Sequence, residues 1–175
     1  MLVQQLSEEE CLDFLKETKF GRLACVRDKQ PYVVPIYFVS DGKHLYAFTT
    51  LGQKIRWMRE NRLVCLEADQ IIDHLHWTSV VVFGKYQELN DKGSLRGLRE
   101  YALELLQHRT MWWQPAVVTI RDSESAEGVV PHIFYRISID EISGRRAGPS
   151  SLAENIPQPL RRRVKDALQT SVTGE

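Results

Sequence analysis

A series of short, β-rich runs, which follow one another closely from Gly21 onward, most constrains how this chain can fold. The runs are rich in β-branched and aromatic residues, which favour strands. They span residues 21–26, 32–39, 44–49, 63–68, 77–89 and, in two pieces, 129–142. Strands this short and closely spaced predict a mainly β protein, in which a closed or nearly closed antiparallel barrel carries short helices at its ends.

The pair Asp41-Gly42 separates the second run from the third. Because glycine readily adopts a positive φ, an Asp-Gly pair between two strands is a strong signal for a β-hairpin. We therefore expect strands 32–39 and 44–49 to be antiparallel neighbours.

Three segments are predicted to be helical. Ser7 and Glu10 have the spacing of a capping box, in which the hydroxyl and the carboxylate bind backbone amides at the start of a helix. The other two segments repeat apolar residues at three- and four-residue steps, as a helix with one buried side does. The expected helices lie at about 8–18, 53–61 and 94–108.

The chain of 175 residues has the length of one domain, since domains usually contain roughly 100–200 residues. From about Arg145 the composition changes to Gly, Pro and Ser, and a basic amphipathic stretch follows at 160–168. We assign residues 1–145 to one domain and 146–175 to a linker with a C-terminal helix. A solvated basic helix is the favoured interpretation of the tail, and docking onto the barrel is the alternative.

The charge balance disfavours some classes of partner. With 23 basic and 23 acidic side chains the chain has no net charge, so a nucleic acid or an anionic membrane would gain little by binding it. No apolar run reaches the roughly 20 residues of a membrane-spanning helix. The first ten residues carry acidic side chains where a secretory signal would be basic, and we expect a cytoplasmic protein.

Cysteine and histidine form no convincing catalytic or metal-binding pattern. Cys11, Cys25 and Cys65 are odd in number and far apart, so we expect buried free thiols, with Cys65 in the core. His74 and His76 could begin a metal site, but no third ligand follows, and a loop with solvent-facing histidines is the favoured interpretation. We expect no metal.

The segment from Thr49 to Lys54 could bind a phosphate group. It joins an expected strand to an expected helix, and the start of a helix offers unpaired amides and a positive dipole. Lys54 adds a positive charge, and Thr49 and Thr50 add hydroxyls. Alternatively, the segment is a polar turn with Thr50 as the N-cap. It is not a P-loop, because the glycine spacing differs.

Pro35 interrupts the second β-rich run. Proline cannot donate a hydrogen bond to a neighbouring strand, so it lies at a sheet edge or a break. The backbone around it could face a planar heterocycle, or the strand could be an ordinary edge strand.

Together these motifs resemble the flavin-binding split barrels related to pyridoxamine phosphate oxidase, in particular the nitroimidazole-resistance branch. The resemblance covers about residues 5–145. It depends on the order and spacing of 21–24, 31–38, the Asp41-Gly42 hairpin, 45–50, 52–54, 61–65 and 79–84.

The resemblance implies an antiparallel split β-barrel that binds FMN between the two subunits of a homodimer. The backbone at Val34, Pro35 and Ile36 would lie along the flavin ring, and Ser79 would reach the flavin from the other subunit. The residues that would hold the ribityl phosphate are Thr49, Thr50, Gln53 and Lys54.

The resemblance further implies an FMN-dependent oxidoreductase that acts on an unidentified small molecule. True pyridoxamine phosphate oxidases end in a substrate segment with arginine and histidine, and residues 137–148 lack that pattern, so vitamin B6 oxidation is not expected. The alternatives are a flavin-storage module and a relative that binds deazaflavin or haem. For haem, the candidate axial ligands are His74, His76 and His132.

Overall fold

The computed structural model describes residues 2–90, 95–107 and 132–148. This part of the chain forms a mostly antiparallel sheet with three helices, α1 (Glu8–Glu17), α2 (Gln53–Glu60) and α3 (Leu95–Gln107). The nine strands of this part are β1 (Leu2–Gln5), β2 (Phe20–Arg27), β3 (Gln30–Tyr37), β4 (Val39–Ser40), β5 (His44–Thr49), β6 (Leu63–Ile71), β7 (Trp77–Leu89), β8 (Ile133–Ser138) and β9 (Glu141–Gly148).

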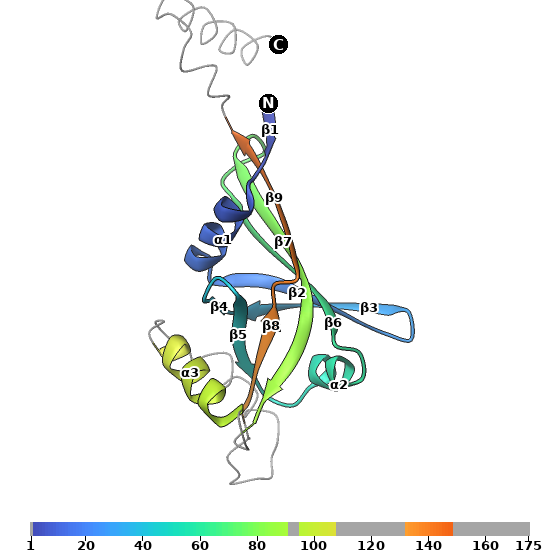
Figure 1. The fold of residues 1–175 in the computed structure, drawn as a ribbon. Coiled ribbons are helices and arrows are strands. Elements are labelled where there is room, and N and C mark those ends of the chain that lie inside the picture. The colour runs from blue at the N-terminus through green and yellow to red at the C-terminus, as the bar shows by residue number, and fades with distance from the viewer. Residues whose placement is uncertain (1, 91–94, 108–131, 149–175) are drawn as a thin grey trace, which may run out of the picture.

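The strands follow the order β3-β2-β6-β7-β8-β5-β4, and β9 pairs with both β7 and β1 (Figure 1). The long strand β7 changes partner along its length. Its first half, Trp77–Phe83, pairs with β9, and its second half, Tyr86–Leu89, pairs with β8. The sheet therefore curls around a core but does not close, since β3 and β4 remain at its two ends. This is a split β-barrel.

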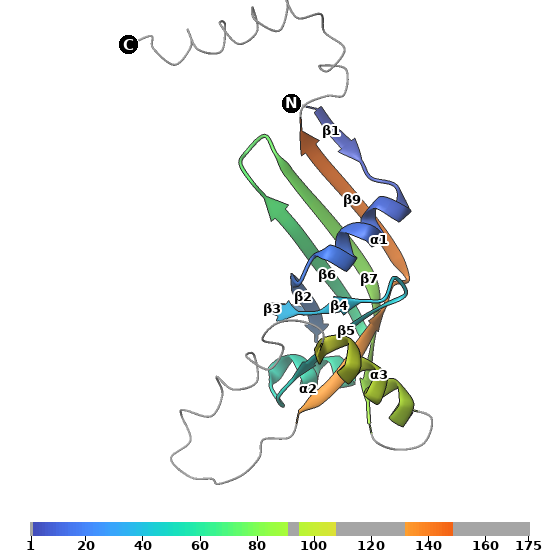
Figure 2. The ribbon, with the colours of Figure 1, turned by 90° about the vertical axis from the view of Figure 1, so that its left-hand side faces the viewer.

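The main core lies inside the curled sheet. Apolar residues of β2, β6, β7 and β8 meet there with Leu15 of α1 and with Ile55 and Met58 of α2. The helix α1 packs on β9 and β7, while α3 covers a second apolar cluster on β5 and β8 (Figure 2). All three helices bury one apolar stripe each, as their periodicity predicts.

Several elements confirm the sequence-based expectations. The capping box is present, because Ser7 Oγ accepts from the Glu10 amide at 3.2 Å and Glu10 accepts from the Ser7 amide at 2.8 Å. The strands at 44–49 and 77–89 have the expected bounds.

The expected pairing of strands 32–39 and 44–49 is wrong for most of its length. Only Val39 and Ser40 pair with β5, while β3 pairs along its whole length with β2. The turn between β2 and β3 is formed by Asp28 and Lys29, whose φ values of 49° and 65° are unusual for residues other than glycine. Two positive φ values in succession match the twist of a tight hairpin. This turn, although it contains no glycine, therefore joins β2 and β3 as antiparallel neighbours.

Two features at the chain ends differ from the expectations. The strand β1, which pairs with β9, was not expected. The strand β9 continues to Gly148, three residues beyond the boundary at 145. The expected helix at 160–168 and the expected β-rich residues 129–131 lie outside the described residues.

Candidate functional site

A pocket of about 350 Å³ lies between β3, the end of β5 and the start of α2. Four of the residues that the sequence singled out line it, namely Pro35, Ile36, Thr49 and Lys54. Phe20, Tyr37 and Phe48 complete the lining with aromatic surface. The pocket thus combines an apolar wall, suited to a planar ring, with the hydroxyl groups of Thr49 and Tyr37 and the ammonium group of Lys54.

Local structure explains how Lys54 enters this pocket. The strand β5 ends at Thr49, and α2 begins at Gln53 after a short turn. The N-cap is Gly52, not Thr50, and no side chain of the described residues caps the first amides of the helix. The first turn of α2 contains no acidic residue. These amides and the helix dipole are therefore available to an anion beside Lys54.

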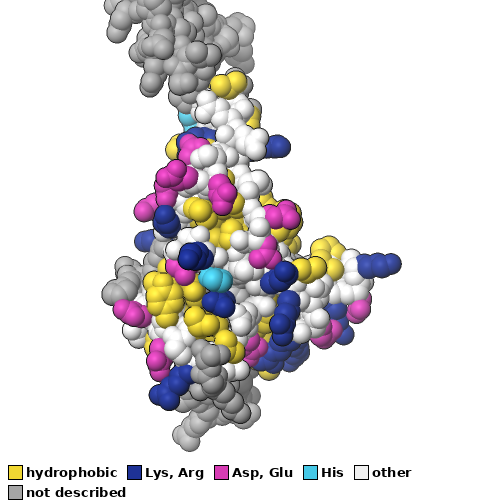
Figure 3. Space-filling view, in the orientation of Figure 1, with side chains coloured by type: hydrophobic (Ala, Val, Ile, Leu, Met, Phe, Trp, Pro, Cys, Tyr) yellow, Lys and Arg dark blue, Asp and Glu magenta, His cyan; other side chains and the backbone are white. Residues whose placement is uncertain are grey.

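The charge of Lys54 has no counter-ion in the described part of the chain. The side chain is half-buried, and the loss of hydration lowers the pKa of its ammonium, with only Cys25 acting weakly in the opposite direction. No carboxylate of the described residues contributes to this pKa, although burial of a cation is favourable only when an anion compensates for the lost hydration. An anionic ligand would provide that compensation. Basic side chains gather over α2 (Figure 3), which carries Lys54, Arg56 and Arg59.

The other predicted residues of this region have different positions. Pro35 lies on the edge strand β3, as expected, and its side chain is exposed. Val34 points to the opposite side of β3 and packs against the core. Thr50 is half-buried and Gln53 is exposed, and neither lines the pocket.

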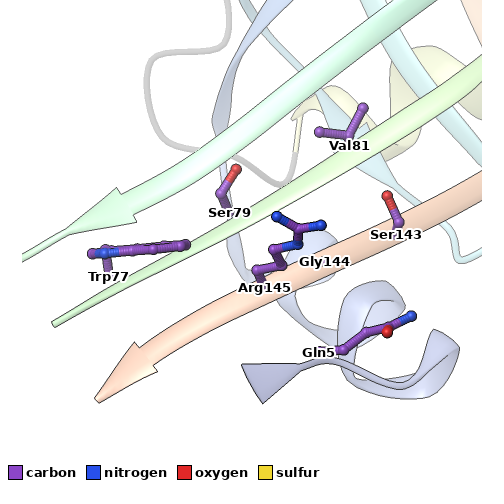
Figure 4. Close-up of a pocket in the computed structure, with 7 residues that line it drawn as sticks. All are labelled: Gln5, Trp77, Ser79, Val81, Ser143, Gly144 and Arg145. Atoms are coloured by element: carbon purple, nitrogen blue, oxygen red, sulfur yellow. The ribbon is translucent and has the colours of Figure 1, made fainter. Parts of the chain in front are cut away.

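Ser79 lies in a second groove, of about 370 Å³, on β7, β9 and β1. Figure 4 shows its seven lining residues, Gln5, Trp77, Ser79, Val81, Ser143, Gly144 and Arg145. The Ser79 hydroxyl donates to Glu67 Oε1 at 2.9 Å. The structure therefore separates Ser79 from the pocket of Lys54 within one subunit.

Cross-strand register nevertheless places both sites on one face of the sheet. Directly opposed residues share a face, and the pairs Pro35–Arg22, Arg22–Glu67, Glu67–Val81 and Val81–Ser143 form one row across five strands. We call this the outer face, because the residues between these positions point into the core. A parallel row on the same face contains Val33, Ala24, Cys65 and Phe83.

A charge network lies at the centre of the outer face. Arg22 donates to Glu67 at 3.0 Å and also to Asp69. These two hydrogen bonds raise the pKa of Arg22, and the bond to Asp69 has the larger effect. With Ser79 also bound to Glu67, the two carboxylates already have partners within the subunit.

Sequence analysis missed Phe20, Arg22, Trp77 and Arg145 as site residues. Their alternation within strands 20–27 and 77–89 was visible, and it assigns each to one of two faces. The sequence did not show, however, which strands are neighbours or in which register they pair.

Three further expectations can be compared with the structure. Cys11 and Cys25 are buried free thiols, but Cys65 is only half-buried and lies on the outer face, so its expected place in the core is wrong. His74 and His76 lie at the turn between β6 and β7, where the His76 ring contacts Asp73 at 2.9 Å. The described residues contain no group of three or more side chains that could hold a metal ion, and no helix long and apolar enough to cross a membrane.

The fold defines a class of protein, the split β-barrels, here with a pocket beside the first turn of α2. Within that class, the family model described as pyridoxamine 5'-phosphate oxidase matches residues 7–146. The chain belongs to this family. The family resemblance expected from the sequence is thereby confirmed.

Individual relatives agree with this assignment. An uncharacterized protein of Rhizobium meliloti is 40% identical over 84% of this chain and 97% of its own length. The crystal structure of a FAD-binding protein from Mesorhizobium loti is 41% identical, covers 85% of this chain and 98% of that one, and gives a TM-score of 0.68. A proposed 5-nitroimidazole antibiotic resistance protein from Bacteroides thetaiotaomicron shares the fold, with 17% identity, coverage of 83% and 89%, and a TM-score of 0.59.

Proposed function

We propose that this protein is a flavin-dependent oxidoreductase of the pyridoxamine phosphate oxidase-like family, which transfers electrons to or from a small molecule. One observation carries the proposal: Lys54, a half-buried cation without a carboxylate partner in the described residues, shares a pocket with Thr49 and Pro35. In this proposal Thr49, Thr50, Gln53, Lys54 and the α2 amides hold the flavin phosphate.

The ring of the flavin would lie along the backbone of Val34, Pro35 and Ile36. An edge strand suits this role, because among the described strands β3 has a neighbour on one side only. Phe20, at 43% exposure, and Tyr37, at 53%, offer aromatic surface beside the same pocket. Ring contacts of this kind orient the cofactor and limit the access of water.

We propose FMN as the cofactor, with FAD as the second candidate. The relative from Mesorhizobium loti is named as a FAD-binding protein. Both cofactors carry a phosphate next to the ribityl chain, so Lys54 would bind either. The bound flavin would supply the electron-transfer chemistry, and this chain would bind it, orient it and shield it from water.

We further propose a homodimer that forms through the outer face. Large apolar side chains on this face are exposed, with Val33 at 57% and Phe83 at 50%. Together with the half-buried Ala24 and Cys65, these two side chains form an apolar row across four adjacent strands. Exposed apolar surface of this extent is typical of a contact surface. In such a dimer, Ser79 of one subunit would reach the flavin held by the other.

The test begins with the absorption spectrum of the purified protein, which distinguishes flavin, deazaflavin and haem. A titration of the apoprotein with FMN should then show that Lys54→Ala weakens binding by about tenfold to a hundredfold, the loss expected for one charge-assisted contact. Riboflavin, which has no phosphate, should bind both proteins equally. Lys43→Ala, at an exposed position in the Asp41-Gly42 hairpin, is the matched control. If the Lys54 variant binds FMN as tightly as the wild type, the proposed phosphate site is wrong.

Reduction by NADH or NADPH, followed by reoxidation with an added acceptor, tests for turnover. A loaded protein that binds flavin but is never reduced would be a flavin-storage module. We propose a cytoplasmic location, where such reductants are available.

A further inference from the structure

The groove on β7, β9 and β1 contains an exposed arginine that has no acidic partner among the described residues. Arg145 lines this groove and forms no hydrogen bond or ion pair with a described residue. Its neighbour in sequence, Arg146, differs, since it donates to Thr78 at 3.4 Å and approaches Glu10 at 3.5 Å. Arg146 therefore has partners within the subunit, while Arg145 remains available to a ligand.

The carboxylates near Arg145 bind other side chains. In the register of the sheet, Arg145 opposes Ser79, which in turn opposes Asp69. Asp69 is bound to Arg22, and Glu67 accepts from both Arg22 and Ser79. An anion that enters the groove would thus meet one guanidinium without a described partner, and two carboxylates whose charge Arg22 partly balances.

An indole ring forms one end of the same groove. Trp77 is half-buried on β7, two residues before Ser79, and Figure 4 shows its ring edge-on, with the Arg145 guanidinium between Ser79 and Ser143 in this view. An indole face stacks on planar heterocycles, and a guanidinium binds phosphate with paired hydrogen bonds. Short polar side chains, Gln5, Ser79 and Ser143, supply further donors and acceptors.

We propose that this groove is a binding site for an adenylate group, with the purine on Trp77 and the phosphate on Arg145. Its volume of about 370 Å³ lies at the small end of the range of ligand pockets, roughly 300–1,000 Å³, which suits one mononucleotide. Two sources of adenylate are chemically equivalent here, the adenylate half of FAD and that of a nicotinamide dinucleotide reductant. The groove lies on the outer face, so in the proposed homodimer it would lie beside the partner subunit, where Ser79 would also contact the partner's flavin. The choice between the two sources therefore rests on the proposed flavin function, whereas the binding of an adenylate group does not.

The direct test uses AMP and adenosine as probes of the whole chain, with binding measured by calorimetry. Arg145→Gln should weaken AMP binding by about tenfold and leave adenosine binding unchanged, because only AMP carries the phosphate. Trp77→Leu should weaken both. Arg145→Lys should restore part of the AMP affinity, and Arg146→Gln is the matched control that should change neither.

Two further arms distinguish the sources. If the adenylate comes from FAD, Arg145→Gln lowers the affinity for FAD and not that for FMN. If it comes from the reductant, Arg145→Gln raises the KM for NADH and not that for reduced nicotinamide mononucleotide. If AMP binding depends on Arg145 but neither the FAD affinity nor the KM for NADH changes, the adenylate site is supported and both sources are excluded.

The proposal is overturned if the wild-type chain shows no saturable AMP binding, or if Arg145→Gln leaves AMP affinity unchanged. The proposed flavin function would fail differently, because the wild-type protein would then bind neither FMN nor FAD. The AMP titration needs no flavin, so the two failures are distinguishable.

Discussion

Gly84 on β7 lies against the backbone of Ser138 on β8, so closely that a Cβ atom at Gly84 would overlap the Ser138 carbonyl oxygen. This contact occurs where β7 leaves β9 and begins to pair with β8. The backbone amide of Lys85, the next residue, donates to the Ser138 hydroxyl at 3.0 Å. Glycine at this point allows the sheet to split, because any side chain would force the two halves apart.

We predict that Gly84→Ala destabilises the protein by about 1–3 kcal/mol, the usual cost of inserting atoms into a well-packed site, or by more. Urea unfolding of the whole chain measures this change. The control is Gly97→Ala in α3, where an added Cβ meets nothing within 4 Å, and there alanine should stabilise the helix by roughly 0.5–1 kcal/mol. Equal stability of Gly84→Ala and the wild type would show that the junction tolerates a side chain.

The affinity for a flavin phosphate should fall as the solution becomes alkaline. Burial lowers the pKa of Lys54 below 10.5 in the free protein, whereas a bound phosphate favours the charged form. The ammonium contribution is therefore complete below the lowered pKa of the free protein, falls as the pH rises above it, and is gone above the higher pKa of the complex. FMN titrations at several pH values, corrected by riboflavin titrations at the same values, measure this effect. In Lys54→Ala the corrected dependence should disappear, and a dependence that persists would assign it to another group.

Ser79→Ala should weaken the binding of FMN and riboflavin to the same extent, by about two- to tenfold, the value of one ordinary hydrogen bond. The reason is that Ser79 is proposed to contact the ring and not the phosphate. Lys54→Ala, by contrast, should affect FMN alone. The two titrations together separate ring contacts from phosphate contacts, and a Ser79 variant that loses only FMN affinity would contradict the proposed role.

Light scattering of the flavin-loaded protein should give twice the chain mass of 20.3 kDa. Phe83→Asp places a charge on the outer face, where Phe83 is 50% exposed, and should produce a monomer that also loses its flavin. Tyr101→Asp is the control, because Tyr101 is 40% exposed on α3 and away from this face. A monomeric wild type, or a dimer that Phe83→Asp leaves intact, would exclude dimerisation through this face.

The sequence by itself determined the local features of this protein. The capping box at Ser7 and Glu10, the strand spans 44–49 and 77–89, and the position of Lys54 at a helix start all depend on residues within a few positions of one another. The motifs in their order also indicated the family. Such features are visible because backbone propensity, capping and turn chemistry act over one or two turns of chain.

Tertiary structure alone decided which strands stand side by side. Alternation assigns a residue to one of two faces, but it does not say which partner or which register its strand adopts. The pairing of β3 with β2 depended on positive φ values at Asp28 and Lys29. The sequence does not indicate these values, because neither residue is a glycine. The register then brought Arg145 opposite Ser79, and Arg22 opposite Glu67, across long stretches of chain. Because these contacts form only when the whole sheet curls around its core, the outer face and its two sites follow from the fold.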